Sequence, residues 1–264
     1  MVEIKGPRIA LRSYEKGDVA RVAEIANNIN IARNMSHTFS HPHTLKDAKD
    51  WVKLAGGPEK SKMKVVFIDH YDSFADLIAY RFNETREDID LKMFKSDCDI
   101  DAIANEKPDL IILGPGPNGP EEAGNYLDVL ANFSNVCPVF GICLGFQAMM
   151  HYFGQKVEVL LEPVHGIDSE IHHNGRGIFK DLPNGARFAR YHSLGVYGVP
   201  ENFHSLGTVS DGDGRDIIMG AQHKSLPLAG VQFHPESFMS MEDDAGRKLI
   251  HNVLTDFMGS ESLK

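Results

Sequence analysis

A cysteine between two glycines is the first candidate for chemistry in this sequence. Cys143 lies in the segment PVFGICLGFQ, where it forms a G-x-C-x-G pattern with Gly141 and Gly145. A strand-like apolar stretch precedes it and a helical pattern follows, which predicts a tight strand-to-helix turn like the one that presents a nucleophilic serine in G-x-S-x-G sequences. The helix N-terminus favours the reactive thiolate, and the backbone N–H of Leu144 is placed to stabilise an oxyanion.

A base for Cys143 is found in the segment AGVQFHPES. His234 follows an apolar run of strand character, and Glu236 comes after a proline that fixes the turn. In an extended chain, residues 234 and 236 point to the same side, so the carboxylate can orient the imidazole. Cys143, His234 and Glu236 are therefore predicted to be the nucleophile, the base and the orienting group of a catalytic triad.

The competing interpretation of any single cysteine is a buried structural side chain, because free cysteines pack as small hydrophobic residues. That interpretation is the better one for Cys98 and Cys137, whose surroundings predict no exposed turn. Three cysteines cannot all pair with one another, and the start of the chain lacks the apolar core of a signal peptide. The sequence therefore predicts a cytoplasmic protein with free thiols.

The elements that must position these residues alternate between strands and helices. Strand-like runs are expected in residues 64–69, 109–113 and 136–142, with helical patterns after the first and the third. This order predicts an α/β fold with a mostly parallel sheet. Shorter strands within ARFARY and LAGVQF would form a mixed edge of that sheet. A final helix would cover the sheet with one apolar face: Leu249, Ile250, Val253, Leu254 and Phe257.

Composition excludes two classes of partner. The 264 residues carry a formal net charge of -10 at pH 7, which leaves no basic face for nucleic acid. No apolar run approaches the roughly 20 residues that a membrane span needs. We therefore expect neither nucleic acid nor membrane as a partner.

Five motifs, in order along the chain, carry a family resemblance. VVFIDHYDSF, LGPGPNGP, GICLGFQAM, RYHSL and GVQFHPES resemble the corresponding motifs of the class I glutamine amidotransferases. The YDSF turn and the HG-x-x-S pattern at residues 165–169 are most similar to component II of anthranilate synthase and to the amidotransferase subunit of aminodeoxychorismate synthase. The resemblance covers residues 63–258 and implies a three-layer α/β fold.

The resemblance also implies roles for individual residues. Cys143 would attack the side-chain amide of glutamine, His234 would carry the proton to the departing ammonia, and Glu236 would orient His234. No metal or organic cofactor is implied. The remaining implied roles concern substrate: backbone oxyanion donors at Gly116 and Leu144, a side-chain contact from Gln147, and backbone contacts from Ser193 and Leu194. Without the motifs, Gln147 would be interpreted as a solvated helix residue and Ser193 as an ordinary strand-end hydroxyl.

The chain departs from the family pattern at three places. Phe146 stands where the family often has histidine, which should alter helix packing more than chemistry. Asn118 replaces a glycine in the Gly/Pro loop, and asparagine is the residue other than glycine that best adopts a positive φ. Ile167 and Asp168 stand where lysine followed by a small residue is commoner, which affects the details of partner docking.

The N-terminal residues follow a different pattern. Residues 1–55 predict a strand, a helix with Val19, Val22 and Ile25 on its core face, and a second helix capped by Thr44. They resemble the opening of a GNAT-type N-acetyltransferase, without the glycine-rich turn that binds acetyl-CoA. We therefore expect a small α+β appendage with no acetyltransferase activity, a linker at residues 56–62, and an amidotransferase domain at residues 63–264.

Three functions remain open on the sequence alone. The first is a glutaminase subunit that supplies ammonia to a chorismate-using synthase on a separate chain, such as anthranilate synthase in tryptophan biosynthesis. The second keeps the enzyme class but has aminodeoxychorismate synthase as the partner. The third is a regulatory or scaffold protein that keeps the fold without turning over glutamine; the presence of all three triad residues argues against it.

Overall fold

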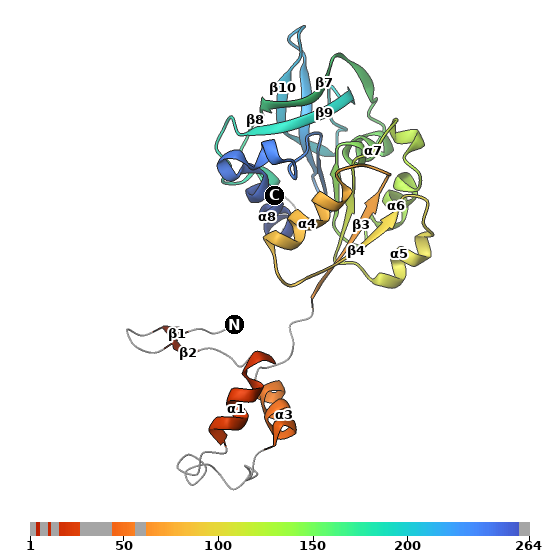
Figure 1. The fold of residues 1–264 in the computed structure, drawn as a ribbon. Helices are drawn as coiled ribbons and strands as arrows, with labels where there is room; N and C mark the ends of the chain where they lie inside the picture. Colours follow the sequence, from red (N-terminus) through yellow and green to blue (C-terminus); the bar gives the residue numbers. More distant parts are fainter. Residues whose placement is uncertain (1–3, 6–9, 12–15, 27–43, 56–61, 259–264) are drawn as a thin grey trace. The chain divides into compact units, whose positions relative to one another are not determined.

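The computed structural model describes residues 4–5, 10–11, 16–26, 44–55 and 62–258. The chain divides into two compact units, Met1–Ser61 and Lys62–Lys264, each with its own internal contacts (Figure 1). Most of the predicted linker and the side chain of Ile25 lie outside the described residues. None of the helices in the described ranges is long and apolar enough to cross a membrane.

In the residues of the first unit that the structure describes, two short strands and two helices that pack against each other are found. Strands β1 (Ile4–Lys5) and β2 (Ala10–Leu11) pair antiparallel, and the short helix η1 (Lys16–Asp18) leads into α1 (Val19–Ala26). Thr44 caps α3 (Leu45–Ala55) as predicted, because its Oγ1 accepts from Asp47 N at 3.1 Å while its own N–H donates to the Asp47 carboxylate. The likeness of this unit to an acetyltransferase remains a prediction.

The second unit is built on an eight-stranded sheet in the order β4-β3-β5-β6-β12-β11-β10-β8. The first five strands in that order pair parallel to one another. The last three, β11, β10 and β8, each pair antiparallel with the strand before them in the order. The mostly parallel α/β sheet is therefore confirmed. The bounds are β3 (Met63–Asp69), β4 (Ile89–Lys95), β5 (Leu110–Leu113), β6 (Val139–Ile142), β8 (His172–His173), β10 (Phe203–Ser210), β11 (Asp216–His223) and β12 (Leu228–Val231).

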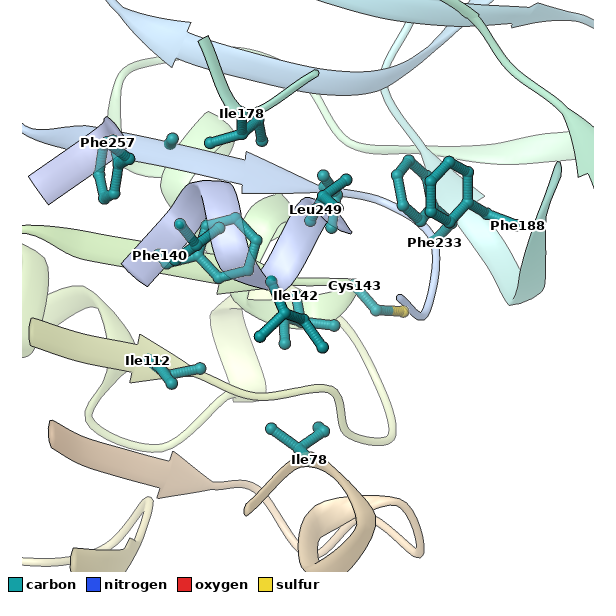
Figure 2. Packing of buried hydrophobic residues seen from close by; sticks show 14 of the residues in the cluster. Ile78, Ile112, Phe140, Ile142, Cys143, Ile178, Phe188, Phe233, Leu249 and Phe257 are labelled. Carbon is teal, nitrogen blue, oxygen red and sulfur yellow. The ribbon is translucent and has the colours of Figure 1, made fainter. Parts of the chain in front are cut away.

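Alternate side chains of the parallel strands point to opposite faces of this sheet, and both sets are buried because helices cover both faces. Phe67, Ile112 and Phe140 belong to the core shared with α4 (Ala75–Thr85) and α8 (Ala245–Asn252). Figure 2 shows Ile112 and Phe140 of this core with Leu249 of α8. Ile111 and Leu113 belong to the core shared with α5 (Ile100–Glu106), α6 (Tyr126–Phe133) and α7 (Leu144–Tyr152). Each fully buried large apolar side chain contributes about 1.5–3 kcal/mol, so the two cores hold the sheet firmly between its helices.

The C-terminal helix buries the face that the sequence predicted. Leu249, Ile250, Val253, Leu254 and Phe257 are all at most 3% exposed. The helix changes character after α8, since Val253–Phe257 forms a π-helical segment (η5). The unit also contains the short 3-10 segments η2 (Pro120–Glu122), η3 (Gly177–Phe179) and η4 (Phe238–Asp244).

Two sequence expectations about the second half of the chain were wrong. ARFARY lies in β9 (Arg187–Gly195), which pairs with β7 (Glu158–Glu170) in a separate two-stranded sheet, and LAGVQF supplies β12 in the middle of the main sheet. The segment HGIDS also lies in β7. Short strands carry too little periodicity to reveal which sheet they join, because the pairing is decided by distant partners.

Candidate active site

Cys143 occupies the turn between β6 and α7, as the G-x-C-x-G pattern predicted. Its φ of 51° and ψ of -101° are strained for a residue other than glycine. Figure 2 shows Cys143 just beyond the strand that carries Phe140 and Ile142. The side chain is 5% exposed, so the turn presents the sulfur inside a nearly closed environment.

The glycines beside Cys143 serve close packing of the turn. The positive φ falls on the cysteine itself and not on Gly141 or Gly145. A Cβ at Gly145 would lie 2.1 Å from the carbonyl oxygen of Leu113, and one at Gly141 would lie 2.6 Å from backbone atoms at the start of α7. The helix can follow the strand this tightly only because both positions lack a side chain.

His234 and Glu236 meet directly in the structure. Strand β12 lies beside β6, with Val231 opposite Ile142, so its carboxyl end brings residue 234 to the same sheet edge as Cys143. His234 Nδ1 lies 2.7 Å from Glu236 Oε1, and both side chains are at most 2% exposed. The two residues were expected in extended chain, but the segment is a turn in which Ser237 N donates to the His234 carbonyl.

The backbone around His234 is held on both sides. Its N–H donates to the Ala189 carbonyl at 2.9 Å, and its carbonyl accepts from the Ser240 hydroxyl at 2.6 Å. The rings of Phe74 and Tyr191 pack against the imidazole with centroid separations of 5.1 and 5.2 Å. The ring therefore has little freedom to leave the position beside Cys143.

Electrostatics favour a protonated His234. Burial lowers the pKa of His234, but the charge of Glu236 and the side chain of Cys143 raise it by more, so it lies well above its ordinary value. Nε2 makes no hydrogen bond of standard geometry to the described residues. The Glu236 carboxylate thus supports a ring that can accept a proton at Nε2. Asp72 lies close to this pair, and burial raises the pKa of its carboxyl.

The Gly/Pro loop after β5 packs against the turn that carries Cys143. The N–H of Gly145 donates to the carbonyl of Gly114 at 3.1 Å. Gly116 lies against His70, where an added Cβ would come within 2.7 Å of the His70 carbonyl. Asn118 adopts a φ of 63°, the positive value for which asparagine is suited. Leu144 begins α7, where the first N–H groups have no acceptor within the helix.

The three other candidate substrate residues lie in α7 and β9. Gln147 is 3% exposed, so it is not a solvated helix residue, and its Nε2 donates to the Leu194 carbonyl at 3.0 Å. Leu194 is partly buried, whereas Ser193 is exposed. The structure therefore brings Gln147 and Leu194 together beside Cys143, with Ser193 next along β9.

Gln232 was missed by the sequence analysis. It is fully buried, and its Nε2 lies 3.6 Å from the Cys143 sulfur while its Oε1 accepts from Gln147 at 3.1 Å. The available signal was its position two residues before His234 at the end of an apolar run, where alternate residues share a side. Within the described ranges, no group of three or more His, Cys, Asp or Glu side chains is arranged to hold a metal ion.

Comparisons with known proteins identify the family of most of the chain. The model of the family Glutamine amidotransferase class-I matches residues 66–254. Anthranilate synthase component 2 of Haloferax volcanii is 34% identical over 203 residues, covering 75% of this chain and 98% of that protein. Aminodeoxychorismate synthase component 2 of Escherichia coli is 40% identical over 194 residues, covering 72% and 98%.

A longer relative and a solved structure extend these matches. The bifunctional protein TrpGD of Thermotoga maritima is 40% identical over 194 residues, which cover 72% of this chain but only 32% of that protein. The crystal structure of a glutamine amidotransferase from Thermotoga maritima shares the fold, with a TM-score of 0.59 at 15% identity, over 75% of this chain and 99% of that one. The chain belongs to the class I glutamine amidotransferases.

Proposed function

We propose that the chain hydrolyses glutamine with Cys143, His234 and Glu236 and delivers the ammonia to a chorismate-using synthase on a separate chain. The observation that carries this proposal is the buried 2.7 Å contact between His234 and Glu236 beside the strained turn at Cys143. Nucleophile, base and orienting carboxylate come from the carboxyl ends of two neighbouring parallel strands.

The reaction begins with attack of the Cys143 sulfur on the side-chain carbonyl carbon of glutamine. His234 holds the proton lost by the Cys143 thiol and passes it to the amide nitrogen as the carbon–nitrogen bond breaks, which releases ammonia and leaves a γ-glutamyl thioester. Water then attacks the thioester with His234 as the base, giving glutamate and restoring the thiol. Glu236 accepts from Nδ1–H and stabilises the imidazolium formed in each step.

The remaining candidate site residues bind the glutamine substrate. Backbone N–H groups of Gly116 and Leu144 stabilise the oxyanion, since the Gly/Pro loop and the start of α7 lie together. Gln147 contacts the bound glutamine, while Ser193 and Leu194 hold its amino-acid end through backbone groups. These roles are supported by the position of Gln147 and Leu194 beside Cys143.

A kinetic test separates the triad from a structural cysteine. Glutaminase activity of Cys143→Ser and of His234→Ala is expected to fall by about a thousandfold or more, because members of a triad act as a unit. Cys137→Ser is the matched control and should retain wild-type turnover. Near-wild-type activity in either triad variant would overturn the proposal. Labelling of Cys143 by a glutamine-analogue electrophile excludes a scaffold role, since a scaffold needs no glutamine-selective thiol.

We propose that the partner is the synthase subunit of anthranilate synthase, the enzyme of which the Haloferax volcanii relative is component 2. Exposed apolar side chains along β7 support a docking role, because Val159, Leu161 and Ile167 are 73%, 52% and 57% exposed. Ammonia must cross unprotonated, so the HGIDS segment of β7 and the YDSF turn are expected to seal the contact.

A second candidate partner is favoured by the Escherichia coli relative, a component of aminodeoxychorismate synthase. The two partners place the amine at different positions of the product, so co-purification with a synthase followed by product identification decides between them. Formation of anthranilate supports the first assignment, and formation of 4-amino-4-deoxychorismate replaces it with the second.

A further inference from the structure

Behind the Cys143 sulfur lies a continuous set of buried polar contacts that the triad does not use. It runs from the sulfur through Gln232 and Gln147 to the Leu194 carbonyl, and from there through His192 and Arg190 to Ser169 on β7. The side chains of Gln147, Arg190, His192 and Gln232 are each at most 5% exposed. Buried polar groups of this kind hold fixed orientations because each lost hydrogen bond is costly.

The orientation of the Gln232 amide follows from its neighbours. The carbonyl oxygen of Leu194 can only accept, so the Gln147 atom that faces it at 3.0 Å must be the NH2 group. The same Gln147 nitrogen lies 3.1 Å from Gln232, which must therefore present Oε1 to it. This leaves the Gln232 NH2 group toward the sulfur of Cys143 at 3.6 Å, where it donates a hydrogen bond.

The Leu194 carbonyl is itself anchored from the other side. His192 Nδ1 lies 2.9 Å from it and must carry the hydrogen, so His192 Nε2 has a free lone pair. Arg190 Nε–H donates to that lone pair at 3.1 Å, and the Arg190 terminal nitrogen donates to Ser169 Oγ at 3.2 Å. Burial, and then the charge of Arg190, lower the pKa of His192 to about 3, so the ring stays neutral and keeps this pattern.

Arg190 is unusual as a buried cation. Within the described part of the chain it forms no ion pair with a carboxylate, and burial lowers the pKa of its guanidinium. A buried guanidinium without a carboxylate partner costs stability. The hydrogen bonds that Arg190 donates to His192 and Ser169 offset part of that cost.

We propose that Gln232 is a further catalytic residue, whose N–H stabilises the Cys143 thiolate, and that Arg190 and His192 are positioning residues that fix its amide through Leu194 and Gln147. This inference rests on the proposed glutaminase function. In the free thiol the Gln232 contact is a weak hydrogen bond, and in the thiolate it becomes charge-assisted, so it favours ionisation.

The first test measures ionisation of the Cys143 thiol directly. The rate of carbamidomethylation by iodoacetamide is followed against pH in the full chain, with the modified peptide identified by mass. Gln232→Glu keeps the shape but presents an oxygen in place of the N–H, and Gln232→Met removes both polar atoms. Each is expected to move the apparent ionisation upward by about one pH unit, which lowers the rate at neutral pH about tenfold.

The control is Gln222, a second buried glutamine, on β11. Gln222→Met should leave the profile unchanged, and circular dichroism confirms the fold of every variant. His234, Glu236 and Asp72 also face this site and are left intact in all variants. An unmoved profile in folded Gln232→Glu and Gln232→Met overturns the inference. Because the readout needs no glutamine, failure of the glutaminase proposal would appear separately, as absent turnover in the wild type.

A double-mutant cycle tests the positioning residues. Arg190→Met is expected to shift the profile in the same direction as Gln232→Met but by less, and to add no shift when Gln232 is already methionine. Arg190→Lys should restore part of the effect, since a lysine amine can still donate to His192. An equal shift from Arg190→Met in both backgrounds, or none in either, would show that Arg190 does not act through Gln232.

Discussion

Strand β6 has a cysteine near each end, and the two thiols have opposite surroundings. Cys137 is 6% exposed and Cys143 is 5% exposed, so burial does not distinguish them. Burial, followed by the charge of Asp109, raises the pKa of Cys137 to about 12. Cys143 instead adopts a strained φ at a helix N-terminus and faces Gln232 and His234. The thiol at the carboxyl end of the strand faces a hydrogen-bond donor, whereas the thiol at the amino end is buried near a carboxylate.

The largest expected difference between the two ends is in reactivity. At neutral pH iodoacetamide should modify Cys143 at least about a thousandfold faster than Cys137, because only about one Cys137 thiol in 100,000 is ionised when the pKa is near 12. Peptide mass spectrometry measures both rates in one sample. Cys98, which is partly buried with a pKa raised by burial, serves as the intermediate reference. Comparable modification rates at Cys137 and Cys143 would contradict the proposed difference in reactivity between the two thiols.

The next largest effect concerns the glycine that allows the turn at the carboxyl end. Gly145→Ala places a Cβ 2.1 Å from the Leu113 carbonyl oxygen, so it should lower the free energy of unfolding by about 3 kcal/mol and reduce glutamine turnover. Gly154→Ala, beyond the other end of α7, meets no atom within 4 Å but has a φ of 88°, and should cost about 1 kcal/mol without loss of turnover. Urea denaturation compares the two; equal losses would show that close packing at residue 145 is unimportant.

The smallest effect is the pH dependence of stability. Because the folded-state pKa of His234 is raised, its contribution to stability is fully present below about pH 6.5 and is lost as pH rises through the folded value. In a Cys143→Ala background, Glu236→Gln should flatten this decline, whose slope is at most about 1.4 kcal/mol per pH unit for one group.

Cys137→Ala is the matched change at the amino end. The raised pKa of Cys137 affects stability only above about pH 8.5, where an unfolded cysteine begins to ionise. The decline between about pH 6.5 and pH 8.5 should therefore persist in this variant, as measured by urea denaturation at each pH. A decline that vanishes in Cys137→Ala, or survives unchanged in Glu236→Gln, would contradict the assignment to His234.

The sequence predicted the parallel core and the positions of Cys143, His234 and Glu236 because local patterns carry them. Runs such as residues 64–69 and the motif around Cys143 have a strand period, a turn and a helix start within about ten residues. It did not predict that residues 158–170 pair with β9, nor the chain of contacts from Arg190 to Gln232. Those features depend on side chains that are distant in sequence, for which a single sequence has no periodic signal.

The pairing of β6 with β12 also has a consequence for the newly made chain. Gln232 follows Cys143 by 89 residues, so the ribosome releases the cysteine well before the strand that supplies its partners. Until β12 inserts beside β6, the thiol has neither the imidazole of His234 nor the amide of Gln232. In the nascent chain Cys143 therefore lacks these partners, and they reach it only when β12, the last of the parallel strands, pairs with β6.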